Sequence, residues 1–291
     1  MMNDLQLFAV TATGPRPLPW PPGATSIHDA FDVLDLGVYS ALRTFAHNKF
    51  LHLDYHLDRT EQSMRLLGWD YILDRMALCR ALHQVCAAYP LPDARVRFDV
   101  LAAPATPLGS DSRLLIALTP FTPVPAACYE EGVRVQLAPR LKRETPLVKA
   151  AGFVLARRPY PLGHPEAYEH LLVNEAAEIL EGSSSNFYAV RDGMVYTAGA
   201  GVLEGITRRI LLALVPALHL PLSLMPIHID DIARLDEAFI TSSSRGVVPV
   251  VAIDGLPVGA GRPGPLTQRL WTAYQEYVQA HIRPAGMRYE V

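Results

Sequence analysis

The residues from Glu181 to Arg209 carry the clearest chemical pattern in the chain. The segment begins with an acid and a turn of small residues, EGSSSN, which ends at Asn186. Two short apolar strands follow, joined by an Asp-Gly hairpin turn at 192–193. The segment closes on residues 205–207, Gly-Ile-Thr, where an apolar-periodic stretch starts. A carboxylate at one end and backbone N–H groups at the other would suit a phosphorylated aromatic cofactor.

The stretch from Thr207 to His219 predicts a helix, because its apolar residues recur at helical spacing. Thr207 is a competent N-terminal residue, and Gly205 lets the backbone approach a ligand closely. The first N–H groups of a helix have no partner within the helix and lie at the positive end of its dipole, so they favour a phosphate. The alternative is an ordinary capped helix with nothing bound.

Lys149 is the leading candidate for a nucleophile. It lies in a neutral segment of small and apolar residues, TPLVKAAGF. Partial desolvation in such a segment lowers the pKa of a lysine and makes the neutral amine available. The alternative is a lysine whose stem lies on a half-buried segment while its ammonium group reaches solvent.

Composition limits the class of protein. The chain has 291 residues, of which 50% are hydrophobic, so it is long enough for a substantial core and two domains. Its net charge is −3 without a run of Lys or Arg, which argues against nucleic acid or an anionic membrane as a partner. The three cysteines show no CxxC spacing, which fits a reducing cytoplasm and argues against disulfides or structural zinc.

Three further patterns argue against a membrane, secreted or metal-binding protein. The apolar stretch 210–227 contains three prolines, so it predicts a buried helix, a turn at Pro221 and a core strand rather than a membrane span. The N-terminus shows no secretory signal. His52 and His56 straddle a strand-to-helix junction, so no metal site is expected there.

The expected elements divide the chain into two domains. Residues 1–120 form an N-terminal α/β domain, 121–132 a Pro-rich linker and 133–291 a C-terminal domain. Helices are expected over 54–67 and 73–88. The expected strands are 5–11, a hairpin of 38–45 with 49–53, 95–101, 113–118, 133–137, 167–173, 186–190, 194–197 and 238–241.

Lys149, the EGSSSN turn and the Gly-Ile-Thr at 205–207 together resemble the fold-type IV family of pyridoxal-phosphate enzymes, the class IV aminotransferases. This family includes branched-chain aminotransferases, D-amino acid aminotransferases and aminodeoxychorismate lyases. The resemblance runs from about residue 38 to about residue 264. It implies an α/β (α+β) fold with an N-terminal α/β sandwich and a C-terminal pseudo-barrel, pyridoxal 5'-phosphate as the cofactor, and a homodimer with its active site at the domain interface.

The resemblance also implies roles for residues that bind the cofactor. Lys149 would carry the cofactor covalently and later act as the base that moves a proton. Glu181 would face the pyridine nitrogen and keep it protonated. Arg59 would pair with the phosphate as a fork, the alternative being a surface arginine on a helix. Asn186 would order the turn that carries Glu181.

Further positions match the phosphate end of the family's site. Ile206 and Thr207 would bind the phosphate through their N–H groups, with the Thr207 hydroxyl adding a bond. Ser243 and Ser244 match a β-turn near the phosphate and the substrate. Tyr168 aligns with a tyrosine that donates to the cofactor's phenolic oxygen.

The substrate side is predicted from arginines. Arg95 and Arg97 alternate with apolar residues on one strand, so both point from the same face and would suit a dicarboxylate. The alternative is an exposed strand face balanced by Asp93 and Asp99. Arg97 matches a substrate-carboxylate arginine of branched-chain aminotransferases, and Arg43, which alternates with Tyr39 toward one face, would add a third carboxylate partner beside the substrate.

The chain satisfies no subgroup of the family fully. D-amino acid aminotransferases and many lyases carry Arg-Gly where this chain has Ala102-Ala103, although EGSSSN itself looks like the D-enzymes. The branched-chain pattern after Tyr39 usually includes Glu-Gly, and Ser40-Ala41 stand here instead.

The resulting hypothesis is an aminotransferase acting on a small-molecule amino acid and a 2-oxo acid. The alternative within the family is a lyase that releases pyruvate from aminodeoxychorismate. The alternative of another class is a non-catalytic protein that binds the cofactor.

Overall fold

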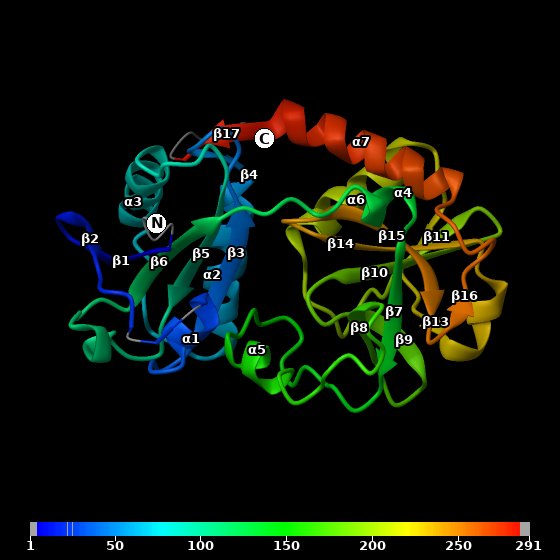
Figure 1. Cartoon of the computed structure of the whole chain (residues 1–291), viewed down its shortest axis with the longest axis horizontal. Helices are drawn as coiled ribbons and strands as arrows, with labels where there is room; N and C mark the ends of the chain where they lie inside the picture. Colours follow the sequence, from blue (N-terminus) through cyan, green and yellow to red (C-terminus); the bar gives the residue numbers. More distant parts are fainter. Residues whose placement is uncertain (1–4, 22, 25, 286–291) are drawn as a thin grey trace. The chain divides into compact units, whose positions relative to one another are not determined.

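A computed structural model describes residues 5–21, 23–24 and 26–285, and the chain folds into two compact units (Figure 1). The first unit takes in residues 1–122, 148–154 and 281–291, and the second takes in 123–147 and 155–280. This division differs from the predicted one, because two later segments return to the first unit. One of those segments contains Lys149.

The first unit is built on an antiparallel sheet of order β2-β1-β6-β5-β3. Its strands are β1 (Gln6–Thr11), β2 (Gly14–Pro17), β3 (Val38–Arg43), β5 (Ala94–Val100) and β6 (Leu114–Pro120). A separate ribbon pairs β4 (Lys49–Leu51) with β17 (Ile282–Pro284). The helical elements are α1 (Ile27–Phe31), α2 (Leu53–Leu66), α3 (Arg75–Ala87) and the short η1 (Thr106–Leu108).

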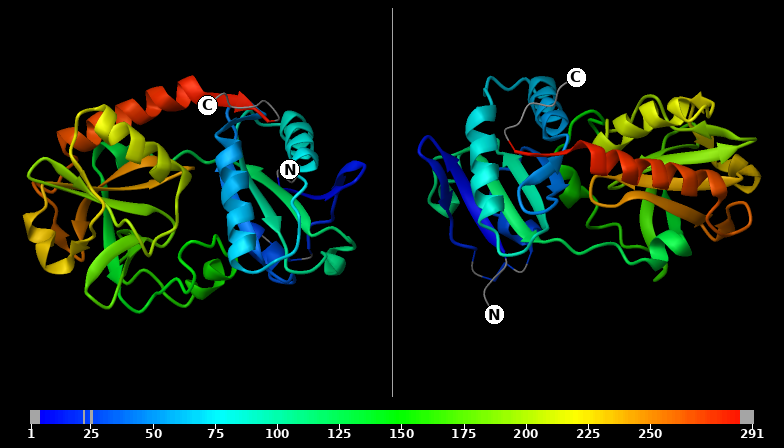
Figure 2. Two further views of the ribbon diagram at one scale, coloured as in Figure 1. Left: turned by 180° about the vertical axis from the view of Figure 1, so that it is seen from behind. Right: turned by 90° about the horizontal axis from the view of Figure 1, so that it is seen from above.

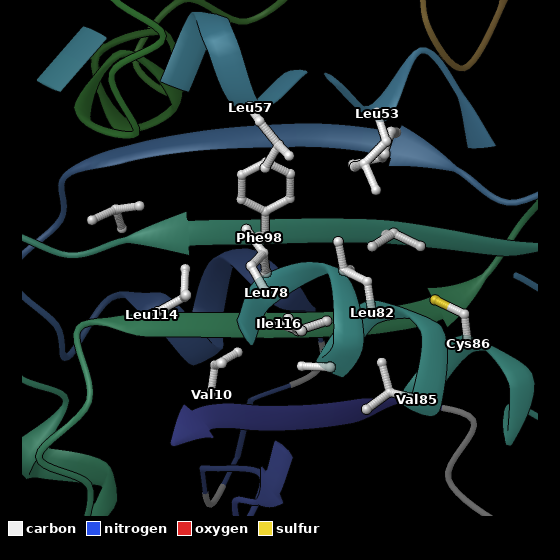
Figure 3. Packing of buried hydrophobic residues seen from close by; sticks show 14 of the residues in the cluster. Val10, Leu53, Leu57, Leu78, Leu82, Val85, Cys86, Phe98, Leu114 and Ile116 are labelled. Atoms are coloured by element: carbon white, nitrogen blue, oxygen red, sulfur yellow. The ribbon is translucent and has the colours of Figure 1, made fainter. Parts of the chain in front are cut away.

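Alternating side chains of this sheet enter two different cores. Phe98 and Ile116 face α2 and α3, where Leu57 and Leu82 pack on them (Figure 3). The intervening residues, such as Leu115, join a second core that includes Phe31 of α1. A sheet whose strands bury residues on both faces needs a layer on each, which is the predicted sandwich.

The predicted hairpin of 38–45 with 49–53 is wrong. β3 pairs with β5 and β4 pairs with β17, so only a single bridge joins Phe45 to Lys49. Ala46 and His47 both have positive φ, which turns the chain sharply away from β3.

The second unit contains a sheet that closes on itself. Its order is β12-β11-β10-β14-β15-β7-β8-β9-β13, and β9 pairs again with β10 where Glu181 lies opposite Asn186. The strands are β7 (Val133–Ala138), β8 (Ala167–Val173), β9 (Glu178–Gly182), β10 (Asn186–Arg191), β11 (Met194–Tyr196), β12 (Leu222–Ser223), β13 (Ile227–His228), β14 (Glu237–Ser242), β15 (Gly246–Ile253) and β16 (Leu256–Pro257). The predicted mixed fold with a sandwich and a pseudo-barrel is confirmed.

Helices of the second unit lie outside this sheet. They are α4 (Ala127–Glu130), α6 (Ile206–Ala217), η2 (Ile229–Arg234) and α7 (Pro265–His281), while α5 (Gly152–Ala156) begins in the first unit. Figure 2 shows α6 and α7 side by side, and the Thr207 hydroxyl lies 3.4 Å from the Tyr274 hydroxyl. The sequence predicts a core strand after Pro221. The structure has only the two half-buried residues of β12 there, and Met225 beyond them is exposed.

Among the described residues, no helix has the length and apolarity needed to cross a membrane. The same residues contain no group of three or more His, Cys, Asp or Glu side chains placed to hold a metal ion.

Candidate active site

Lys149 is fixed through its backbone to the start of β3. Its carbonyl accepts a hydrogen bond from the Tyr39 N–H at 3.0 Å, and its own N–H donates to the Ser63 hydroxyl at 3.1 Å. The neighbours Val148 and Ala151 are buried, while Lys149 itself is half-buried. Its Nζ lies 5.0 Å from the centre of the Tyr39 ring. The Lys149 backbone is thus held in place by hydrogen bonds to Tyr39 of β3 and Ser63 of α2.

Arg59 lies on the buried face of α2 and not on the surface, so the alternative of a surface arginine is wrong. Only 7% of the residue is exposed, and its Nη2 donates to the Ser40 hydroxyl of β3 at 3.2 Å. His56 lies one helical turn earlier and is also buried. Burial, then the charges of Arg59 and Lys149, hold the pKa of His56 well below its usual value. His56 therefore stays neutral beside two cations.

This neutral histidine makes the first unit less stable in acid. The pKa of His56 is lower in the folded chain than in the unfolded chain. Below about pH 6.5, His56 therefore takes up a proton in the unfolded chain but not in the folded chain. We expect the free energy of unfolding to fall by about 1 kcal/mol per pH unit below that point. His56→Phe should lose this slope in urea titrations at pH 6.5 and 5.5, whereas the exposed His83→Gln should keep it. Equal slopes in the parent and His56→Phe would contradict this assignment.

Glu181 of the second unit is a buried carboxylate with donors on both oxygens. Its Oε1 accepts from Arg143 Nε at 2.9 Å. Its Oε2 accepts from the Leu203 N–H at 3.1 Å and from Asn186 Nδ2 at 3.4 Å. Glu181 is 2% exposed, and the Arg143 side chain is 7% exposed. The carboxylate is thus fixed in position by a cation, an amide and the chain that leads to α6.

Asn186 connects this carboxylate to the start of α6. Its Nδ2 also donates to the Leu203 carbonyl at 2.8 Å. Its Oδ1 lies so close to Gly205 that a Cβ at that position would meet it at 2.1 Å. Gly205 is therefore required by close packing against a buried side chain that is itself held by hydrogen bonds.

Replacing Gly205 with alanine tests this packing. The added methyl group has to displace Asn186, which should cost about 1–3 kcal/mol of stability, as overpacking of a core does. Urea unfolding at constant pH measures the change. Gly152→Ala is the matched control, because nothing lies within 4 Å of its Cβ position. A Gly205→Ala variant as stable as that control would contradict the close contact.

The N-terminus of α6 suits a phosphate group. Gly205 precedes the helix in an extended conformation, and no side-chain bond caps the helix among the described residues. The first bond into the helix runs from the Arg209 N–H to the Gly205 carbonyl at 2.9 Å. Ile206 and Thr207 are buried in the first turn, where backbone N–H groups have no partner within the helix.

These residues fit pyridoxal phosphate on chemical grounds. The uncapped N–H groups of α6 match a phosphoryl group, and the buried carboxylate of Glu181 matches a protonated ring nitrogen. In the first unit, Lys149 matches the covalent attachment of an aldehyde.

The turn that carries Ser243 and Ser244 lies between β14 and β15, and Arg245 fixes it. Its guanidinium donates to the Ser242 hydroxyl at 2.8 Å, to Glu169 at 2.8 Å and to the Ser184 carbonyl at 2.9 Å. Tyr168 of β8 is adjacent, with its ring centre 5.6 Å from the Arg245 Cζ. Burial opposes a charged Glu169, yet Arg245 and the serine donors outweigh it and lower its pKa.

The predicted substrate arginines have different surroundings. Arg97 is buried and binds Asp99 through two hydrogen bonds, whereas Arg95 is exposed. Arg43 binds Asp93 and lies over the ring of Phe121. The aspartates that sequence reasoning treated only as balancing charges are thus direct partners of two of the three arginines.

Within each unit the structure brings several of the predicted residues together. In the first unit, Lys149 and Arg97 both lie at the ring of Tyr39, while Arg59 bonds the neighbouring Ser40. The second unit groups Glu181, Asn186, Ile206 and Thr207, with Tyr168 and the 243–244 turn near Arg245. Sequence reasoning missed Arg143 and Arg245. Arg245 follows the serine turn directly and was visible as a charge in a small-residue segment, whereas no spacing pattern marks Arg143.

Comparison with known proteins identifies relatives of this arrangement. Residues 37–253 match the family model for amino-transferase class IV. Over 130 residues the chain is 33% identical to a D-alanine aminotransferase of Staphylococcus aureus, and the aligned region covers 41% of this chain and 46% of that protein. Over 114 residues it is 37% identical to a D-alanine aminotransferase of Bacillus licheniformis, and the aligned region covers 38% of this chain and 40% of that protein. The aligned regions thus span about half the length of these curated relatives or less.

Solved structures share the fold at low sequence identity. The branched-chain amino acid aminotransferase of Thermobaculum terrenum, in its PLP-bound holo form, is 22% identical, with a TM-score of 0.77 over 97% of this chain and 98% of that one. The Escherichia coli branched-chain amino acid aminotransferase is 21% identical, with a TM-score of 0.72 over 90% and 92%.

Proposed function

Because the chain belongs to the class IV aminotransferase family of pyridoxal-phosphate enzymes, we propose that it transfers an amino group between an amino acid and a 2-oxo acid. One observation carries the proposal. In the second unit, Asn186 links a buried carboxylate, Glu181, to the uncapped start of α6 through one set of hydrogen bonds, which supports Glu181 as the ring-nitrogen partner and the helix start as the phosphate site.

Each residue has a defined part in this reaction. When bound, pyridoxal phosphate supplies an electron sink for the substrate's Cα–H bond. Glu181 accepts a hydrogen bond from a ring N–H and holds the proton there. Ile206 and Thr207 bind a phosphoryl group through their N–H groups. Lys149, fixed by its backbone bonds to Tyr39 and Ser63, would take the proton from the substrate's Cα and deliver it to the cofactor carbon that carries the amino group, and would move it the opposite way in the second half-reaction.

Titration of the purified, cofactor-loaded protein with amino donors tests the proposal. L-glutamate, D-glutamate, L-leucine and D-alanine are added separately while the absorption spectrum is recorded. Conversion of the yellow form to the pyridoxamine form by any one of them supports transamination, and that donor gives the handedness. A spectrum that no donor changes, together with pyruvate release from aminodeoxychorismate, would favour the lyase instead. The homodimer implied by the resemblance remains a prediction, which sedimentation equilibrium measures.

A further inference from the structure

Arg97, the arginine assigned to a substrate carboxylate, forms a buried ion pair with Asp99. Arg97 Nε donates to Asp99 Oδ2 at 2.7 Å, and Nη2 donates to Oδ1 at 2.6 Å. These two N–H groups form one of the forked edges with which a guanidinium binds a carboxylate. The Arg97 side chain is 6% exposed and that of Asp99 is 0% exposed. A carboxylate of the chain itself therefore occupies this edge, and burial leaves little of the remaining guanidinium exposed to a substrate carboxylate.

Aromatic rings hold this pair beside the candidate nucleophile. The Arg97 Cζ lies 4.5 Å from the centre of the Phe31 ring and 4.4 Å from that of Tyr39. Lys149 Nζ lies 5.0 Å from the centre of the same Tyr39 ring. Arg97 and Lys149 thus contact one tyrosine, so the charge at Arg97 is within reach of a substrate bound at the amine.

We propose that Asp99 is a specificity-determining residue that withholds Arg97 from a second substrate carboxylate. The proposal rests on the proposed function and names its substrate class, which is amino acids with an uncharged side chain and the matching 2-oxo acids. A substrate side-chain carboxylate at this position would gain no net attraction, because Asp99 already balances the charge of Arg97. It would also be repelled by the nearby Asp99 carboxylate and would lose its hydration. An amide or apolar group avoids that repulsion. The substrate class therefore differs from the dicarboxylate expected from Arg95 and Arg97.

Binding of two unreactive ligands to the cofactor-loaded protein tests this assignment without turnover. Glutarate carries two carboxylates, and its monoamide replaces one of them with a neutral group of the same shape. Calorimetry should show that the parent binds the monoamide at least as tightly as glutarate. Asp99→Asn should bind glutarate about tenfold more tightly than the parent, because the forked edge of Arg97 becomes available for charge-assisted bonds. Its affinity for the monoamide should stay within about twofold of the parent's, because that ligand brings no second charge.

Two variants control for indirect effects. Adding Arg97→Met to Asp99→Asn should abolish the gain for glutarate. Asp58→Asn makes the same chemical change in an exposed pair, since Asp58 binds Arg75 at 2.7 Å on the surface, and it should leave both affinities unchanged. Circular dichroism and thermal unfolding establish that each variant is folded.

Three results would overturn the proposal. The first is a parent that binds glutarate more than about tenfold more tightly than the monoamide, as a free arginine would, and this test requires no variant to fold. The second is a folded Asp99→Asn whose affinity for glutarate equals that of the parent. The third is that neither glutarate nor its monoamide binds to the parent or to Asp99→Asn. Spectral conversion by an amino donor tests the proposed function separately. The proposed function and the proposed role of Asp99 can therefore fail independently.

Discussion

Replacing Lys149 with alanine is expected to lower the rate of amino transfer by at least ~10³-fold, because the variant loses the amine that we propose moves the proton at Cα and binds the cofactor covalently. The fold should persist, since the bonds of Lys149 to Tyr39 and Ser63 use its backbone atoms and survive the change. Stopped-flow or steady-state assays with the best donor measure the rate, and thermal unfolding measures the fold.

Lys142→Ala is the matched control for this variant. Lys142 lies seven residues earlier and forms an exposed pair with Glu175 at 2.8 Å, so its loss should leave the rate unchanged. A Lys149→Ala protein that retains the parent's rate, or a Lys142→Ala protein that loses it, would contradict the assignment of the nucleophile.

Replacing Glu181 with glutamine is expected to reduce both stability and rate. Its ion pair with Arg143 is buried, and breaking such a pair by removing one partner costs about 3–5 kcal/mol. The rate should fall by about 10²–10³-fold, because the fixed charge that we propose faces the cofactor's ring nitrogen is removed. Urea unfolding and the donor assay measure the two effects on the same preparation.

The double variant Glu181→Gln with Arg143→Met separates these effects. Both charges then leave the interior together, so most of the stability should return while the rate stays low. Glu175→Gln, which alters an exposed partner of Lys142, should change neither property. A double variant that regains the parent's rate along with its stability would show that Glu181 serves only to hold Arg143.

Local patterns in the sequence were sufficient for the elements that carry the site. The apolar periodicity after Gly205 predicts α6, and the observed helix runs from Ile206 to Ala217. Alternation along 95–101 correctly predicts β5 and the shared face of Arg95 and Arg97. That alternation contains no information on burial, however. The same pattern is consistent with an exposed Arg95 and with an Arg97 enclosed by Phe31 and Tyr39.

Contacts between distant segments were beyond the reach of the sequence. Closure of the second sheet places Glu181 opposite Asn186 and sets the turn after β14 against Ser184 and Glu169, where Arg245 joins them. Arg143 reaches Glu181 from a loop with no periodicity. The wrong hairpin has the same origin, because β4 finds its partner, β17, near the far end of the chain.

The most direct test of Lys149 as the cofactor-binding residue is to reduce the cofactor-loaded protein with borohydride and map the modified peptide by mass spectrometry. The chain contains three lysines, Lys49, Lys142 and Lys149, so the attachment site can be assigned without ambiguity. If Lys149 holds the cofactor, the reduced pyridoxal phosphate should be found on Lys149 alone. Modification of Lys49 or Lys142 instead, or no modification after loading, would contradict it.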